Sequence, residues 1–199
     1  MFSSSAAFSP ADWQDGIDIV LLTHSTEYQK STNTGVLVQQ SLLSGRVRVR
    51  RVPWSRVEPD ALLIKSLPEQ CSFLLYPEPE ALILDVEHWQ LHWQQQATPE
   101  STEQLQQQPV GTQRRCIQLI LLDATWQLAR KMYNQSPYLQ QIPSIRLQSA
   151  RPSQYLLRRN QTSDGWCTAE TVILLLTAFG LIAEATLLQQ SFECFNQRS

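Results

Sequence analysis

An aspartate stands where an apolar segment gives way to a helical pattern. Residues 116–122 are largely apolar, and Asp123, Ala124, Thr125 and Trp126 follow them directly. Such a run is typical of a buried strand, and open α/β folds build their ligand crevices at the carboxyl ends of strands. A carboxylate there can accept a proton or anchor a hydrogen bond, so we expect any chemistry of this protein at this junction.

Structural interpretations compete with that chemistry. Aspartate is a preferred helix N-cap, and Asp123 precedes a predicted helix, so taken alone it is better explained as a cap than as a catalyst. Trp126 fits either core packing or a platform on which a nucleobase or adenine stacks. The junction by itself leaves both alternatives open.

A polar turn precedes the segment 36–43, which is apolar at helical spacing. Ser31 or Thr32 is a candidate cap of that helix. The turn is either ordinary turn chemistry or a loop that holds a polar or anionic ligand group at a helix N-terminus. Its members are Thr32, Asn33, Thr34 and Gly35.

The long apolar segment 171–188 also has polar residues before it. Thr168 and Glu170 are either capping residues or hydrogen-bond partners of a ligand hydroxyl or ammonium group. Further upstream, Arg158 and Arg159 are either solvated surface residues or a pair that binds phosphate or carboxylate.

Cations alternate with valines over residues 46–50, which predicts a half-exposed strand. Arg46, Arg48 and Arg50 would then share one face and form a positive stripe suited to a phosphate backbone. An exposed strand without a partner explains the same pattern equally well.

The order of apolar segments predicts the fold. Further strands are expected at 17–24 and 72–76, a short apolar run follows at 81–84, and helices are expected at 36–43, 125–134 and 171–188. Strands that alternate with helices predict an α/β fold with a mainly parallel sheet and helices on both faces. Residues 1–16 are expected to be an N-terminal extension and 17–199 one domain, with an exposed Gln-rich insertion at about 89–113.

Composition limits the possible functions. The chain has 199 residues, of which 42% are hydrophobic, and a formal net charge of -2. This suffices for one core and gives no global electrostatic argument for nucleic acid. Gly180 and Glu184 interrupt the segment 171–188, which favours a core helix over a membrane span. The N-terminus lacks the basic and apolar regions of a secretory signal, so we expect a cytoplasmic protein.

No metal site is expected. His88 and His92 are four residues apart but lack a third ligand at a recognisable spacing, so we expect them to be exposed. Motifs of P-loop hydrolases, dinucleotide-dependent dehydrogenases, serine hydrolases and metalloproteases are absent. Reduced, mostly buried thiols are expected of the four widely spaced cysteines, Cys71, Cys116, Cys167 and Cys194.

Taken in order, these motifs resemble the DTW-domain family, the tRNA-uridine aminocarboxypropyltransferases. The resemblance covers about residues 17–188, and the ordered set is more specific than any one of its members. Its elements are HSTE at 24–27, STNTG at 31–35, LYP at 75–77, LLDATW at 121–126, YLQQIP at 138–143, YLLRR at 155–159 and CTAE at 167–170.

The resemblance implies an α/β fold similar to that of the SPOUT RNA methyltransferases, with a C-terminal knot. It implies transfer of the 3-amino-3-carboxypropyl group of S-adenosylmethionine to N3 of a tRNA uridine, with methylthioadenosine released. Asp123 would be the general base, and Arg158 and Arg159 would contact RNA phosphate or the methionine carboxylate. The residues implied to hold the donor or the base are Thr32, Asn33, Thr34, Gly35, Thr125, Trp126, Thr168 and Glu170.

Many members of that family carry a cysteine module near the N-terminus, whereas this chain has no cysteine before Cys71. The Arg46 strand is the candidate replacement for RNA docking. Other functions stay open: aminocarboxypropyl or methyl transfer to ribosomal RNA by a related fold, and a non-catalytic RNA-binding protein. The joint presence of Asp123, Thr125 and Trp126 favours catalysis, because RNA binding alone requires no buried acid.

Overall fold

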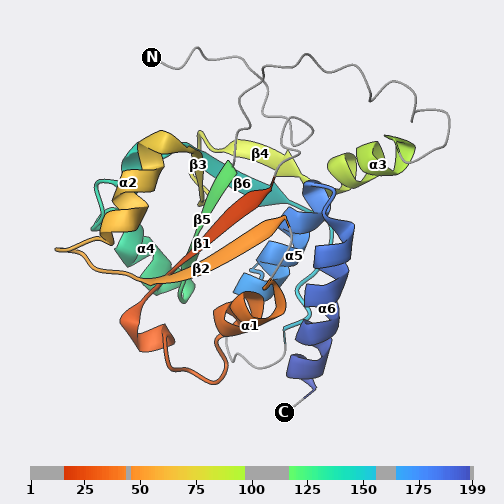
Figure 1. Ribbon diagram of the computed structural model, residues 1–199, viewed down its shortest axis with the longest axis horizontal. Helices are drawn as coiled ribbons and strands as arrows, with labels where there is room; N and C mark the ends of the chain where they lie inside the picture. The colour runs from red at the N-terminus through yellow and green to blue at the C-terminus, as the bar shows by residue number, and fades with distance from the viewer. Residues whose placement is uncertain (1–15, 44–45, 97–116, 156–164, 198–199) are drawn as a thin grey trace.

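A parallel sheet organises the molecule in the computed structural model, which describes residues 16–43, 46–96, 117–155 and 165–197 (Figure 1). Six strands lie in the order β2-β1-β5-β3-β6-β4, and every neighbouring pair is parallel. The strands are β1 (Ile17–Thr23), β2 (Val47–Pro53), β3 (Cys71–Leu75), β4 (Leu82–Asp85), β5 (Ile117–Asp123) and β6 (Ser144–Gln148).

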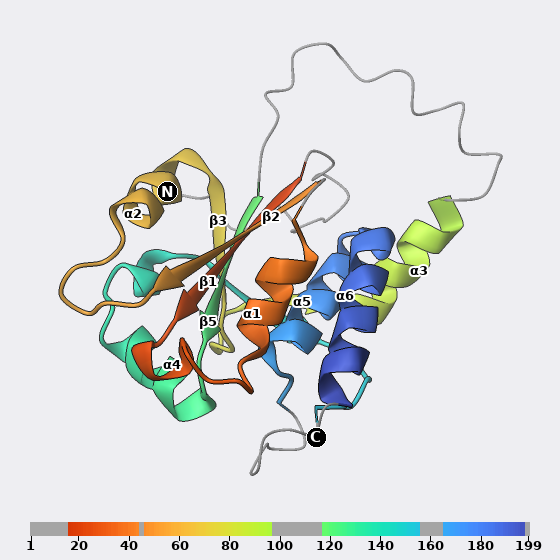
Figure 2. The same ribbon diagram turned by 60° about the horizontal axis from the view of Figure 1, so that its bottom comes forward.

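Helices cover both faces of this sheet, as expected (Figure 2). The helices are α1 (Thr34–Ser41), α2 (Ala61–Glu69), α3 (Val86–Gln96), α4 (Trp126–Asn134), α5 (Thr168–Ala178) and α6 (Ile182–Asn196), with short 3-10 turns η2 (Ser25–Glu27) and η5 (Leu139–Gln141). One face carries α1, α3, α5 and α6, and the other carries α2 and α4. The predicted α/β fold is therefore confirmed, whereas the C-terminal knot stays a prediction.

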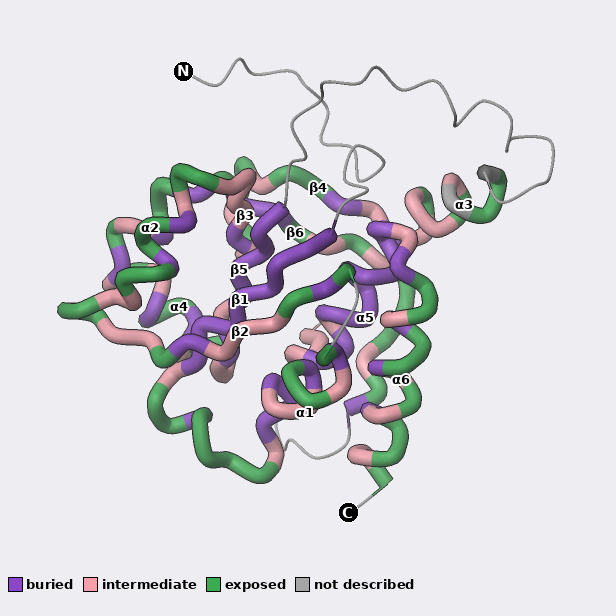
Figure 3. The backbone as a smooth tube through the Cα atoms, viewed as in Figure 1, coloured by how far each residue is buried: buried purple, intermediate pink, exposed green. Residues whose placement is uncertain are grey.

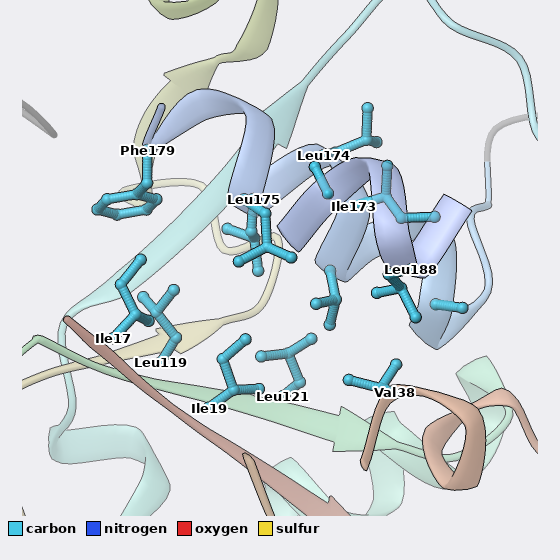
Figure 4. Packing of buried hydrophobic residues seen from close by; sticks show 14 of the residues in the cluster. Ile17, Ile19, Val38, Leu119, Leu121, Ile173, Leu174, Leu175, Phe179 and Leu188 are labelled. Carbon is cyan, nitrogen blue, oxygen red and sulfur yellow. The ribbon is translucent and has the colours of Figure 1, made fainter. Parts of the chain in front are cut away.

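The central strands are buried on both faces, which explains why their sequences are continuous apolar runs (Figure 3). Ile17 and Ile19 of β1 point toward α5, which carries Leu175 (Figure 4), and Leu21 belongs to the same buried cluster. The alternate residues Val20 and Leu22 belong to the second core, beneath α2 and α4. This two-sided burial holds the carboxyl ends of β1 and β5 rigidly in place.

The apolar segment 171–188 is two helices rather than the one predicted. Gly180 adopts a φ of 71°, which ends α5 and lets the chain turn into α6. No helix among the described residues has the length and apolar character needed to cross a membrane.

The segment predicted as an exposed Gln-rich insertion begins as regular structure. Helix α3 continues to Gln96, so residues 89–96 are helical, and 97–113 lie outside the described residues. His88 is exposed as expected, but His92 is half-buried, and both rings lie edge-on to Trp89. Within the described part of the chain, no group of three or more histidine, cysteine or acidic side chains is arranged to hold a metal ion.

The connections that follow β1 and β5 lead toward opposite edges of the sheet. The chain leaves β1 through α1 on one face to reach β2, and leaves β5 through α4 on the other face to reach β6. Neighbouring strands whose connections diverge in this way open a crevice at their carboxyl ends. Thr23 and Asp123 are register partners at that edge.

Candidate active site at the carboxyl ends of the central strands

Asp123 ends β5 as a buried carboxylate that several segments hold by hydrogen bonds. It is 1% exposed. Thr23 donates to Oδ2 at 2.9 Å, and Thr168 donates to Oδ1 at 2.8 Å. The side-chain amide of Asn33 donates to both oxygens at 3.1 Å. The carboxylate thereby joins β1, the turn before α1 and the start of α5 at one point.

Asp123 does not cap the helix that follows it. The N-cap of α4 is Thr125, whose hydroxyl accepts from the backbone N–H of Leu128 at 3.5 Å. The capping alternative for Asp123 is therefore wrong, because its oxygens turn toward the neighbouring segments and away from α4. Two residues separate the strand end from the helix, which is enough for the cap to move to the threonine.

Asn33 is the true cap of α1, in place of the expected Ser31 or Thr32. Its Oδ1 accepts from the N–H of Gly35 at 2.8 Å and of Val36 at 3.3 Å. Because the oxygen faces the helix, the amide nitrogen must face Asp123. One side chain thus caps the helix and fixes the position of the carboxylate.

Gly35 is required for that close approach. A Cβ added to it would lie 2.5 Å from Oδ2 of Asp123. Its neighbour Thr34 accepts from the N–H of Ala169 at 3.2 Å, which ties the start of α1 to the start of α5. Two helix N-termini therefore converge beside the carboxylate, where their dipoles favour a negative charge.

The sequence-based prediction missed Arg51, the last cation of β2. Its side chain is 6% exposed, and Nη2 lies 3.6 Å from Oδ2 of Asp123. The guanidinium also lies over the ring of Tyr28, 4.4 Å from its centroid. Arg51 follows Arg50 directly and so breaks the alternation of the strand, which is the signal that could have revealed it.

The arrangement offsets the cost of burying a carboxylate. An unpaired buried charge costs several kcal/mol, on the order of 3–5 kcal/mol when one partner of a buried pair is removed. Here two hydroxyls, an amide, a guanidinium and two helix N-termini face Asp123. Among the described residues that donate to Asp123, Thr23 and Asn33 are buried and Thr168 is half-buried. The hydroxyl of Thr168 is therefore the contact that connects the carboxylate with the protein surface.

Glu170 has a structural role, in agreement with the capping alternative. Its carboxylate accepts from the backbone N–H of Cys167 at 2.8 Å and forms a capping box at the start of α5. It also accepts from the hydroxyl of Ser153 at 2.8 Å and 3.1 Å. With its oxygens engaged in this way, Glu170 supports the position of Thr168.

The predicted arginine stripe does not lie beside Asp123. Arg46 and Arg48 are at the amino-terminal end of β2, roughly 15–25 Å along the strand from its carboxyl end. Arg48 holds Asp18 by two hydrogen bonds of 2.6 Å and 3.0 Å. Arg158 and Arg159 lie outside the described residues.

An aromatic stack lines the same edge of the sheet on the α4 side. Trp126 is 60% exposed and stacks on Tyr76 with ring centroids 5.7 Å apart. Tyr76 stacks in turn on Tyr133, whose hydroxyl donates to Glu78. Burial and that hydrogen bond raise the pKa of Tyr133 to about 12. Arg130 is exposed one helical turn beyond Trp126.

The described cysteines differ in their exposure. Cys167 is buried, Cys71 is half-buried and Cys194 is exposed, so the expectation of mostly buried thiols holds only for the first. The three are free thiols, and Cys116 lies outside the described residues. Burial, reinforced by the negative charge of Glu170, raises the pKa of Cys167 to about 12.

That difference predicts selective alkylation. With maleimide at pH 8, Cys194 is expected to react, whereas Cys167 should stay unmodified in the native protein because the thiolate is the reactive form. Peptide mass spectrometry would measure both sites, and denaturant should make Cys167 reactive. Rapid native labelling of Cys167 would contradict its burial at the N-terminus of α5.

Comparison with known proteins identifies the family of this chain. The family model of the DTW domain matches residues 8–199. The chain belongs to the DTW-domain family. A relative from Drosophila melanogaster named tRNA-uridine aminocarboxypropyltransferase 2 is 28% identical over 157 residues, which are 77% of this chain and 52% of the relative. The DTW-domain chain thus spans about half the length of that relative, and no solved structure gives a significant match.

Proposed function

We propose that this DTW-domain protein transfers the 3-amino-3-carboxypropyl group of S-adenosylmethionine to N3 of a tRNA uridine. Family membership and the name of the Drosophila relative support a tRNA-modifying transferase. The observation that carries the proposal is the buried carboxylate of Asp123 at the carboxyl ends of β1 and β5, which accepts a hydrogen bond from the half-buried hydroxyl of Thr168.

The proposed reaction is a nucleophilic substitution at carbon. Uridine N3 loses its proton and forms a bond to the γ-carbon of the donor, while the bond from that carbon to the sulfonium sulfur breaks. The electron pair goes to sulfur, and methylthioadenosine leaves. Since the sulfonium is already a good leaving group, the protein has to position the two reactants and remove the proton.

Asp123 is the proposed acceptor of that proton, through Thr168. Thr23 and Asn33 occupy the carboxylate from the buried side, so a uridine N–H has no direct access there. The hydroxyl of Thr168, 2.8 Å from Oδ1, can take the N3 proton as it gives its own to Asp123. General-base catalysis of this kind contributes about 10²- to 10⁴-fold to the rate.

The surroundings of Asp123 suit the two substrates differently. The buried side, formed by the turn at 32–35 and Arg51, is polar and suits the small charged donor. The α4 side of the same sheet edge carries the exposed Trp126, stacked on Tyr76, and suits a flipped base. Arg130 and Lys131 line a depression on α4 beside it and are available to RNA phosphates.

The test is to incubate the protein with unmodified tRNA and S-adenosylmethionine labelled in the methionine carbon chain. Mass analysis of the nucleosides should show uridine with the labelled aminocarboxypropyl group and an equal amount of methylthioadenosine. Modification of ribosomal RNA instead, a transferred methyl group, or tRNA binding without any product would each replace the proposal by one of the alternatives.

Replacement of Trp126 by alanine is expected to weaken tRNA binding roughly 5- to 100-fold, because one aromatic stack on a base contributes about 1–3 kcal/mol. Since the side chain is largely exposed, the melting temperature should change little. Binding would be measured by fluorescence anisotropy, with Trp126→Phe as the variant that retains a ring. Unchanged tRNA affinity in the alanine variant would remove Trp126 from the RNA surface.

A further inference from the structure

Arg51 carries a buried hydrogen-bonding edge that is not used. Its Nε and Nη2 nitrogens are buried and donate no hydrogen bond to any described residue. The nearest anion, Oδ2 of Asp123, is 3.6 Å from Nη2, too far for a good hydrogen bond. A buried unsatisfied donor of a charged group is costly, so a position of this kind points to a missing partner.

The same strand shows what that edge can do. Arg48 uses its own Nε and Nη2 to hold the carboxylate of Asp18, with one oxygen at 2.6 Å from Nε and the other at 3.0 Å from Nη2. This two-pronged geometry is the one in which a guanidinium binds a carboxylate best. Arg51 presents the same two atoms without a hydrogen-bond acceptor among the described residues. The carboxylate of Asp123 pairs with Nη2 only at 3.6 Å.

The position of Arg51 limits the ligand. Its plane is covered by the ring of Tyr28, so an anion must bind in the plane, along the free edge. The side chain is 6% exposed, which suits a slender terminal carboxylate better than a phosphate within an RNA chain. Tyr28 itself is 38% exposed, so the covered face of the guanidinium lies close to the surface.

We propose that the Nε and Nη2 edge of Arg51 binds the α-carboxylate of the S-adenosylmethionine donor. This inference rests on the proposed function and adds a donor-binding residue from β2. Arg51 then fixes one end of the aminocarboxypropyl group near Asp123 and Thr168, which directs the γ-carbon toward the uridine. The role is that of a substrate-binding residue, and no bond changes at the guanidinium.

Isothermal titration calorimetry with two nucleosides tests the proposed binding of the donor carboxylate by Arg51. S-adenosylmethionine has the carboxylate, and methylthioadenosine lacks the entire aminocarboxypropyl group. In Arg51→Gln, affinity for S-adenosylmethionine is expected to fall roughly 10- to 100-fold, as for the loss of charge-assisted hydrogen bonds. Affinity for methylthioadenosine should stay within about twofold, because that ligand does not reach Arg51.

Two further variants keep the test decisive. Arg51→Lys retains the charge beside Asp123 but lacks the fork, so it should fold normally and still lose affinity for S-adenosylmethionine alone. The control variant Arg146→Gln removes an exposed arginine from β6. It should bind both nucleosides with the affinity of the wild-type protein.

Three results would overturn the inference. Equal losses for both nucleosides in Arg51→Lys would make Arg51 a structural partner of Asp123, and unchanged affinity for both would leave its edge without a role in donor binding. Loss of tRNA affinity with donor binding retained would assign the edge to phosphate. If the unchanged protein binds neither nucleoside, the proposed function itself fails, which the first titration reveals before any variant is made.

Discussion

Replacement of Asp123 by asparagine is expected to reduce aminocarboxypropyl transfer by at least roughly 100-fold, as for the loss of a general base. The variant keeps the size of the side chain but cannot accept the proton that Thr168 would pass on. The measurement is a single-turnover rate at saturating S-adenosylmethionine, made well below the melting temperature of the variant.

The same substitution should also destabilise the fold. An amide nitrogen would face one of the donors Thr23, Asn33 or Thr168, and Arg51 would lose its neighbouring negative charge. A cost on the order of 3–5 kcal/mol is expected. Asparagine can replace an aspartate that only caps a helix, but the cap of α4 is Thr125 and not Asp123.

Rescue by pH separates catalysis from stability. In a folded Asp123→Asn protein, the rate should rise with hydroxide concentration, because solvent base then removes the uridine proton. Thr168→Ser keeps the hydroxyl and should retain activity, whereas Thr168→Ala should lose it. Full transfer activity in Asp123→Asn at neutral pH would exclude the carboxylate as proton acceptor.

Replacement of Gly35 by alanine is the second change with a large expected effect. In an ordinary helix this substitution stabilises by about 1 kcal/mol. Here the new Cβ would lie 2.5 Å from Oδ2 of Asp123, an atom that Thr23 and Asn33 hold in place. Crowding of a packed site costs about 1–3 kcal/mol, so the sign should reverse.

Thermal unfolding and donor titration would measure this effect. A loss of 1–2 kcal/mol corresponds to a melting temperature lower by about 2–8 °C for a chain of this size. Gln39→Ala, at an exposed position of the same helix, should leave both quantities nearly unchanged. A higher melting temperature in Gly35→Ala would show that the carboxylate can move away without cost.

These residues explain why the site is assembled from distant segments. Thr23, Asn33, Asp123 and Thr168 come from separate parts of the chain, and the register of β1 and β5 brings the first and third together. A single carboxylate is then a shared partner for three elements. Catalysis and folding depend on the same contacts, so a variant has to be judged by both.

Much of this could be predicted from the sequence. Continuous apolar runs identified β1 and β5, because strands buried on both faces lack alternation. The alternation of strands and helices gave the parallel sheet with two covered faces. Asp123 was placed at a strand end because the apolar run stops there, and the ordered motifs around it indicated the family.

Only the tertiary structure decided what each polar residue does. Several neighbouring polar residues could cap each helix, and the sequence does not distinguish between them. In the structure Asn33 caps α1 and Thr125 caps α4, so the side chain of Asp123 is available for contacts with other segments. Glu170 closes the capping box of α5, while Thr168, two residues away, donates to the carboxylate of Asp123. Arg51 was missed because its partners lie in other segments, and sequence periodicity carries no information about contacts between elements. Local spacing determines which elements form, whereas strand order and register determine which side chains meet.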